Sequence, residues 1–279
     1  EVRSAFLERY VDDATGSITD PEPAGSHLAS RRFAPVLAPE TQTGYVLPLV
    51  FSMLDAARAE RAGRRLVGLV EDAGRRLATG FCGSAFLPAA LELAGRADLA
   101  YELLLRREQP SLGFMAEMGA TSVWERWDGL GASGWPACPT MNSFNHYAMS
   151  SMLSWLVEGV CGLRPVPDAP GFVAFEFRPA LSRRLEHAAL RYDSAAGPLA
   201  LSWEWDGPDR VIASLDVPAG SSCELATALT VDERPARARL ARVSGEPAAD
   251  RPSGGAPHDE RALAVRLGRG RHEARYELS

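Results

Sequence analysis

The sequence predicts a mainly helical first part followed by a module of β-strands, and three features support this division. Apolar residues recur at a helical spacing of about 3.6 up to residue 160. After residue 171 they alternate with polar residues, as in half-buried strands. Between the two patterns lies the segment 163–171, LRPVPDAPG, whose three prolines cannot continue a helix. We interpret this segment as a stiff linker.

The helical part begins with residues 1–11, which are typical of the end of a helix. The apolar run 45–54 follows Thr41 and Thr43, and either threonine is a suitable N-cap. Further helices are expected at 66–77, after an interruption at Gly63, then from a cap at Ser84 to a stop at Gly95, and at 98–107.

Residues 108–140 show no period and are rich in Gly, Pro and Trp. A loop of this length inside a compact domain is uncommon and often functional. It leads into the clearest helix of the chain, capped by Asn142 or Ser143 and closed by Gly162. We expect Phe144 and Tyr147 of this helix to face the core.

Strands are predicted where the apolar residues alternate beyond the proline-rich segment. The segment 244–260 is rich in Gly, Pro and Asp and is expected to be a loop. The predicted strands are 172–177, 188–192, 199–205, 211–217 and 262–267.

Bulk composition excludes several classes of function. The 279 residues carry a formal net charge of −6, which argues against a nucleic-acid partner. No apolar run reaches the roughly 18 residues of a membrane span. The four Cys form no CxxC pair, so we expect buried free thiols and no metal site.

The N-terminus has neither an initiator Met nor a signal-peptide pattern, and it opens inside an expected helix. We therefore expect a fragment of a longer protein. The compartment stays open, with a cytoplasmic location favoured over secretion.

The region 108–147 concentrates Trp, Glu, Arg, Asn and His side chains. Aromatic rings pack on the apolar faces of sugars, while carboxylates and His bind their hydroxyls. Spacing alone favours plain packing over a sugar site, although a carboxylate flanked by Trp is also suited to glycosidase chemistry.

The runs GATSVWERWD at 119–128 and MNSFNHY at 141–147 together resemble the paired motif of bacterial α-L-rhamnosidases. This resemblance covers nearly the whole chain, including TQTGY at 41–45. It implies that residues 1–164 are the second half of an (α/α)6 six-hairpin barrel. Residues 165–279 would then be a C-terminal antiparallel β-sandwich domain.

The resemblance also implies inverting hydrolysis of terminal α-L-rhamnosides without a cofactor. Glu125 occupies the position of the catalytic general base, which removes a proton from the attacking water. Arg126 is included among the candidate substrate-binding residues, and it is expected either to keep the Glu125 carboxyl ionised or to be structural. Asp128 either orients Arg126 or, as we favour, is simply solvated.

His146 occupies the sugar-binding position of the family, although a His at a helix start also serves as a cap. Trp124 and Trp127 are candidates for stacking on the sugar, against the alternative of core packing. Glu117 is the other carboxylate near the loop that merits a test.

The family's general acid lies in an earlier segment with an Asp-Cys-Pro-like run, which these residues lack. An (α/α)6 barrel needs about a dozen helices, whereas the apolar periods mark about six. Three explanations fit the missing acid segment and the low number of helices. Either the sequence is part of a longer enzyme, or the gene is truncated, or the half-barrel binds another chain that supplies the rest.

We therefore expect a rhamnose-containing glycoside as substrate and include a homo-oligomer among the partners. The alternatives are a vestigial or partner-dependent carbohydrate-binding fragment and a six-hairpin glycosidase for another sugar.

Overall fold

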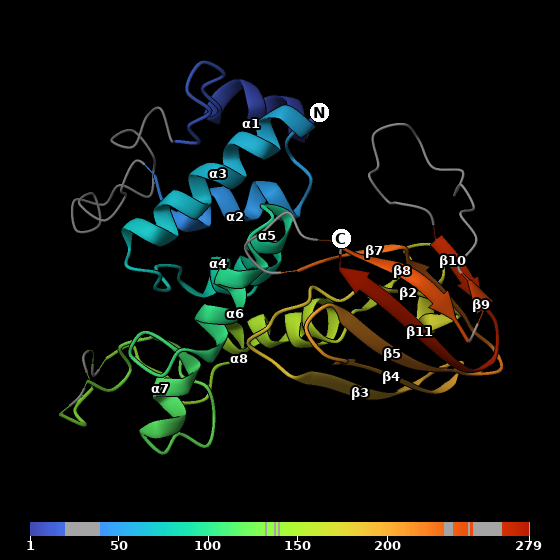
Figure 1. Cartoon of the computed structure of the whole chain (residues 1–279). Coiled ribbons are helices and arrows are strands. Elements are labelled where there is room, and N and C mark those ends of the chain that lie inside the picture. The colour runs from blue at the N-terminus through green and yellow to red at the C-terminus, as the bar shows by residue number, and fades with distance from the viewer. Residues whose placement is uncertain are drawn as a thin grey trace. The chain divides into compact units, whose positions relative to one another are not determined.

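A computed structural model describes residues 1–19, 40–131, 133–136, 138, 140–231, 237–244, 246–247 and 264–278. The chain forms two compact units, Glu1–Leu153 and Ser154–Ser279. Figure 1 colours the first unit from blue to green and the strands of the second from yellow to red. Each unit is described by itself.

The first unit is helical, as predicted. Helix α2 begins after Thr41, whose Oγ1 accepts a hydrogen bond from Gly44 N at 3.1 Å, so this predicted cap is confirmed. The helices are α1 (Val2–Tyr10), α2 (Gln42–Val50), α3 (Ala56–Asp72), α4 (Phe81–Ser84), α5 (Leu87–Leu93), α6 (Ala97–Leu105), α7 (Leu112–Glu117) and α8 (Tyr147–Ser150), with the 3-10 turn η2 (Ser151–Leu153) after α8.

Two glycines behave differently in the helical unit. Gly95 adopts a φ of 73° and ends α5, as predicted. Gly63 does not interrupt a helix but lies inside α3, where an added Cβ would approach the Cβ of Ala94 to 3.1 Å. Close packing of α3 on the end of α5 therefore accounts for this glycine, and the predicted break was wrong.

The core of the first unit lies between α2, α3, α5 and α6, which pack on one another. Burial of these apolar side chains stabilises the unit in proportion to the area removed from water. Its fully buried large residues include Tyr45, Leu66, Leu87, Leu91, Leu99, Tyr101 and Leu103.

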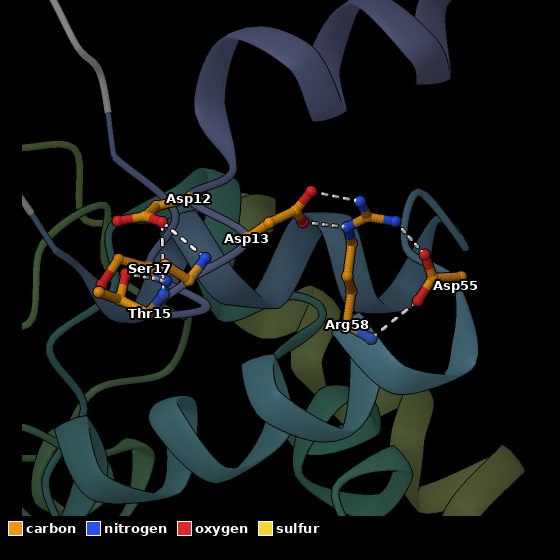
Figure 2. A network of polar contacts seen from close by, with 7 residues as sticks. Asp12, Asp13, Thr15, Ser17, Asp55 and Arg58 are labelled. Carbon is orange, nitrogen blue, oxygen red and sulfur yellow. Dashed lines mark hydrogen bonds and ion pairs between the residues drawn. The ribbon is translucent and has the colours of Figure 1, made fainter.

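Arg58 links the segment after α1 to the start of α3 (Figure 2). Its guanidinium donates to both carboxylate oxygens of Asp13 at 2.7 Å and also pairs with Asp55, which caps α3 through Arg58 N at 2.9 Å. Hydrogen bonding to Arg58 holds the pKa of the Asp13 carboxyl below its usual range. Nearby, Asp12 accepts from Ala14 N in a tight turn that leads back to Ile18.

The same segment is held a second time by a buried tyrosine. Tyr45 OH accepts from Ile18 N at 3.1 Å and donates to Glu40, which also pairs with Arg65. The Glu40 side chain is 16% exposed. Hydrogen bonds from Arg65, and then from Tyr45, lower the pKa of Glu40 from 4.5 to about 2, although partial burial opposes them.

The second unit contains two sheets that share one core, so a sandwich forms. Among the described residues, one sheet has the order β1-β2-β6-β10 and the other the order β3-β4-β5-β11-β8-β7, with β9 beside β8. The strands are β1 (Leu163–Pro165), β2 (Ala174–Phe177), β3 (His187–Ser194), β4 (Gly197–Trp205), β5 (Arg210–Val217), β6 (Ser222–Ala226), β7 (Ala228–Thr230), β8 (Arg237–Val243), β9 (Glu246–Pro247), β10 (Ala264–Leu267) and β11 (Gly270–Leu278).

Every strand pair in the described part of this unit is antiparallel except β2–β6, which is parallel, so the predicted change from α to antiparallel β structure is confirmed. Phe175 and Phe177 of one sheet share the core with Trp203 and Tyr276 of the other, and all four are almost fully buried. Trp203 Nε1 donates to Val160 O at 2.7 Å, which ties β4 to the short π-helix η3 (Leu156–Val160).

The structure differs from the predictions for the proline-rich segment and for the helix before it. Residues 163–165 form edge strand β1, where Pro165 needs no ladder hydrogen bond, and the turn η4 (Pro170–Phe172) follows. The predicted helix from Asn142 to Gly162 is divided into α8, η2 and η3. Gly162 still ends it, with a φ of 80°.

The cysteines differ from expectation. All four are free, but only Cys223 is buried, whereas Cys82 is exposed. The predicted loop at 244–260 falls almost entirely outside the described residues. None of the helices in the described ranges is long and apolar enough to span a membrane.

The lowered pKa of Glu40 predicts an acid-sensitive helical unit. An ionised Glu40 stabilises the fold above about pH 4.5, and this contribution is lost as the pH falls toward 2. We expect the melting temperature of the wild type to fall further between about pH 6 and about pH 3 than that of Glu40→Gln, whose amide does not titrate. Thermal unfolding followed by circular dichroism measures the difference.

The matched control is Glu8→Gln, which removes an exposed carboxylate from α1. This variant should follow the wild-type pH dependence. Parallel curves for the wild type and Glu40→Gln would show that Glu40 does not contribute to acid sensitivity.

Candidate functional site

The candidate site is built by two stretches of chain without regular secondary structure that run past each other. Glu125 N donates to Ser143 O, and His146 N donates to Val123 O, both at 2.8 Å. This pairing brings residues 123–125 beside residues 143–146. The two principal predicted site residues, Glu125 and His146, therefore lie on adjacent segments.

The Glu125 carboxylate is oriented by a main-chain donor. Ser143 N donates to Glu125 Oε2 at 2.8 Å, so one residue both accepts from the Glu125 backbone and donates to its side chain. The carboxylate is partly exposed. One of its two oxygens is thus held in place.

The neighbouring arginine points to a different partner. Arg126 Nε and Nη2 donate to the two carboxylate oxygens of Asp128 at 2.9 and 3.0 Å. These bonds hold the pKa of Asp128 below its usual range. Asp128 therefore orients Arg126, and our preference for a merely solvated Asp128 was wrong.

His146, and neither Asn142 nor Ser143, is the N-cap of α8, because Ala148 N donates to His146 Nδ1 at 3.3 Å. The helix consequently starts three or four residues later than the two predicted caps would place it. Asn142 instead donates to Gly129 O at 2.7 Å, within the loop.

Aromatic rings surround the imidazole of His146. Tyr147 stacks on it, with ring centroids 5.6 Å apart and an interplanar angle of 6°, and Phe81 lies 6.1 Å away. Tyr147 is 79% exposed and Phe144 is 40% exposed. The prediction that both residues face the core was therefore wrong. The reason is the late start of α8, which removes Phe144 from the helix and places Tyr147 in its first turn.

The two predicted tryptophans occupy different environments. Trp124 is 3% exposed and packs edge-on against Phe144, with centroids 5.6 Å apart. Trp127 is half-buried, and its Nε1 donates to Thr79 O at 2.9 Å. Stacking of either ring on a sugar stays a prediction.

Sequence reasoning missed two residues that hold this loop. Gln109 Nε2 donates to Trp127 O at 3.0 Å, and Thr79 supplies the carbonyl that accepts from the Trp127 indole. Backbone acceptors leave no trace in a single sequence. Glu117, the other carboxylate we singled out, pairs with Arg107 at 3.2 Å on the surface.

No cluster of three or more His, Cys, Asp or Glu side chains that could hold a metal ion occurs within the described ranges.

Comparison with known proteins identifies the family. The model of the bacterial alpha-L-rhamnosidase 6 hairpin glycosidase domain matches residues 1–160, and that of the bacterial alpha-L-rhamnosidase C-terminal domain matches residues 162–238. The chain belongs to the bacterial α-L-rhamnosidase family. The two models divide at residues 160–162, and our boundary at 164/165 stays a prediction.

Individual relatives agree with the family models. An α-L-rhamnosidase of Alteromonas sp. (strain LOR) is 36% identical over 187 residues, which cover 66% of this chain and 20% of the relative. One from Streptomyces avermitilis is 34% identical over 186 residues, which cover 67% and 18%. The chain therefore spans about a fifth of the length of these family members.

Solved structures agree with the predicted second half of a six-hairpin barrel and a C-terminal β-sandwich. The Streptomyces avermitilis α-L-rhamnosidase complexed with L-rhamnose superposes with a TM-score of 0.75 at 26% identity, over 98% of this chain and 23% of that one. The α-L-rhamnosidase from Aspergillus terreus gives a TM-score of 0.74 at 26% identity, over 98% and 26%. The expectation of a C-terminal portion of a family member is confirmed.

The packing under the loop predicts a sensitive glycine. A Cβ at Gly129 would lie 2.9 Å from Trp124 Cε3 and 3.2 Å from Asn142 Oδ1. We expect Gly129→Ala to destabilise the chain by about 1–3 kcal/mol, because the buried ring cannot yield without repacking. Urea denaturation followed by tryptophan fluorescence measures this loss.

Gly131→Ala is the matched control, since the nearest atom to its added Cβ would be Trp135 O at 3.7 Å. This variant should stay within about 0.5 kcal/mol of the wild type. Equal denaturation midpoints for the two variants would contradict the tight packing of Trp124 on Gly129.

Proposed function

We propose that this chain forms the base-bearing part of the active site of an α-L-rhamnosidase that hydrolyses terminal α-L-rhamnosides with inversion. The observation that carries the proposal is the Glu125 carboxylate, held by Ser143 N on a segment paired with His146. The names of the relatives, and L-rhamnose in the Streptomyces avermitilis structure, support this sugar.

In the proposed reaction, Glu125 accepts a proton from a water molecule as that water attacks the anomeric carbon. A second carboxyl, the general acid, protonates the leaving oxygen, and inverting enzymes hold the pair about 6.5–9.5 Å apart. We assign this acid to an earlier segment of the enzyme, outside the 279 residues. By this assignment the chain alone would be inactive.

His146 is suited to binding a sugar hydroxyl. Its Nδ1 accepts from Ala148 N, so a neutral imidazole carries its proton on Nε2. That N–H can donate to a hydroxyl beside the exposed faces of Tyr147 and Phe81. We assign a packing role to Trp124, because it is 3% exposed.

The hydrogen bonding of Arg126 favours a neutral sugar over a uronide as the substrate. A carboxylated sugar is recognised best by an arginine whose fork is open for bidentate hydrogen bonding. Arg126 directs Nε and Nη2 at Asp128 instead. This supports a deoxysugar such as rhamnose over the alternative of another, acidic sugar.

Glu125→Gln tests the proposal in the protein encoded by the complete gene that contains this sequence. Loss of a positioned base should lower kcat on an aryl α-L-rhamnoside by about 10²–10⁴-fold. Glu117→Gln is the control, since Glu117 pairs with Arg107 on the surface, and it should keep wild-type turnover. Unchanged turnover in Glu125→Gln would remove Glu125 from the mechanism.

His146→Ala separates binding from chemistry in the same protein. Loss of one hydroxyl contact should raise KM by about fivefold, in line with a hydrogen bond worth about 1 kcal/mol. His146→Asn keeps a side-chain acceptor for Ala148 N and should show the same increase if the Nε2 donor matters. A normal KM in both variants would argue against His146 as a sugar ligand.

A further inference from the structure

The loop that carries Glu125 is fastened to the helical core through Trp127, two residues further along the chain. The indole Nε1 donates to Thr79 O at 2.9 Å, and the main-chain carbonyl of Trp127 accepts from Gln109 Nε2 at 3.0 Å. Ring and backbone of one residue are therefore held by two different partners. Such double anchoring fixes the local course of the chain.

The acceptor of the indole bond is itself immobilised. Thr79 is 3% exposed, and its carbonyl and hydroxyl both contact Ser84 Oγ, at 3.2 and 2.8 Å. The preceding residue, Ala78, donates its N–H to Gln42 Oε1 at 3.1 Å. Gln42 is 3% exposed and also donates to the carbonyl of Arg76 at 3.2 Å.

These contacts form a continuous path from the core of the helical unit to the candidate base. Gln42 and Ser84 fix the segment 76–79, Thr79 fixes the indole of Trp127, and Trp127 fixes one end of the segment 125–127. The other end is fixed by the backbone pairing of Glu125 with Ser143. Glu125 thus lies at one anchor and two residues before the other.

We propose that Trp127 is a positioning residue for Glu125, acting through its hydrogen bond to Thr79 O, and not a ring on which the sugar stacks. The inference rests on the proposed role of Glu125 as the base. A misplacement of about 1 Å in a reacting group can cost about 10²-fold in rate. Slackening this anchor should therefore affect catalysis more than binding.

Trp127→Phe tests the anchor in the protein encoded by the complete gene, because phenylalanine keeps an aromatic ring but lacks the N–H donor. We expect kcat on an aryl α-L-rhamnoside to fall about tenfold, with KM within about twofold of the wild type. Trp135→Phe is the matched control: Trp135 belongs to the same aperiodic region but is 77% exposed, and both constants should stay unchanged.

Gln109→Leu provides a second variant, since it removes the other anchor and leaves the indole intact. It should lower kcat in the same way as Trp127→Phe. An increase in KM at unchanged kcat in Trp127→Phe would show that the ring stacks on the sugar and would overturn the proposal. Wild-type values for both constants in both variants would overturn it too.

A double-mutant cycle distinguishes action through Glu125 from a general structural role. If Trp127 acts by placing the base, Trp127→Phe should cost less than about twofold in the Glu125→Gln background, because the group that it positions is already lost. An undiminished tenfold loss there would contradict the proposal. Full turnover in Glu125→Gln alone would instead refute the proposed base, so the two failures are distinguishable.

Discussion

The site depends on one constraint: the segments 123–125 and 143–146 lie in neither a helix nor a sheet, yet their backbone polar groups need partners. They find them in each other, through the bonds of Glu125 N to Ser143 O and of His146 N to Val123 O. This pairing brings Glu125, the candidate base, onto a segment adjacent to that of His146, the candidate sugar-binding residue. It also aims Ser143 N at the Glu125 carboxylate, so the same interaction shapes the loop and orients its functional group.

The helical unit also attaches the loop that carries Glu125 to its buried core. The buried side chain of Gln42 is part of this support, because it hydrogen-bonds both to Leu69 O of α3 and to the segment 76–79. That segment in turn accepts the hydrogen bond of the Trp127 indole. The motif TQTGY, which helped to indicate the family, is explained by these contacts. Thr41 caps α2, Gln42 fixes the chain before α4, and Tyr45 holds Ile18.

Features that depend on neighbouring residues could be predicted from the sequence, whereas features that depend on distant residues could not. The cap at Thr41 and the stops at Gly95 and Gly162 were predictable, because they depend on a few neighbouring residues. The start of α8 was not, since His146 as a cap competed with Asn142, which makes a longer-range bond to Gly129. Strand β11 was missed because every second residue is charged or polar on the solvated face, and small Ala274 contributes little apolar signal. Glu125 and His146 came from the family motif, whereas the acceptors that hold them come from distant backbone.

The contacts that orient Glu125 have a consequence for how the active site is assembled. Ser143, Thr79 and Gln109 all belong to the helical unit, as does the loop itself. The orientation of the proposed base is therefore determined by residues of its own unit, independently of the residue that would supply the acid. A preorganised carboxylate needs no rearrangement when substrate arrives, which is how positioned groups lower a barrier. In a two-carboxylate mechanism the remaining requirement on the rest of the enzyme is then one of placement: the acid must be brought to the far side of the sugar from a base that is already fixed.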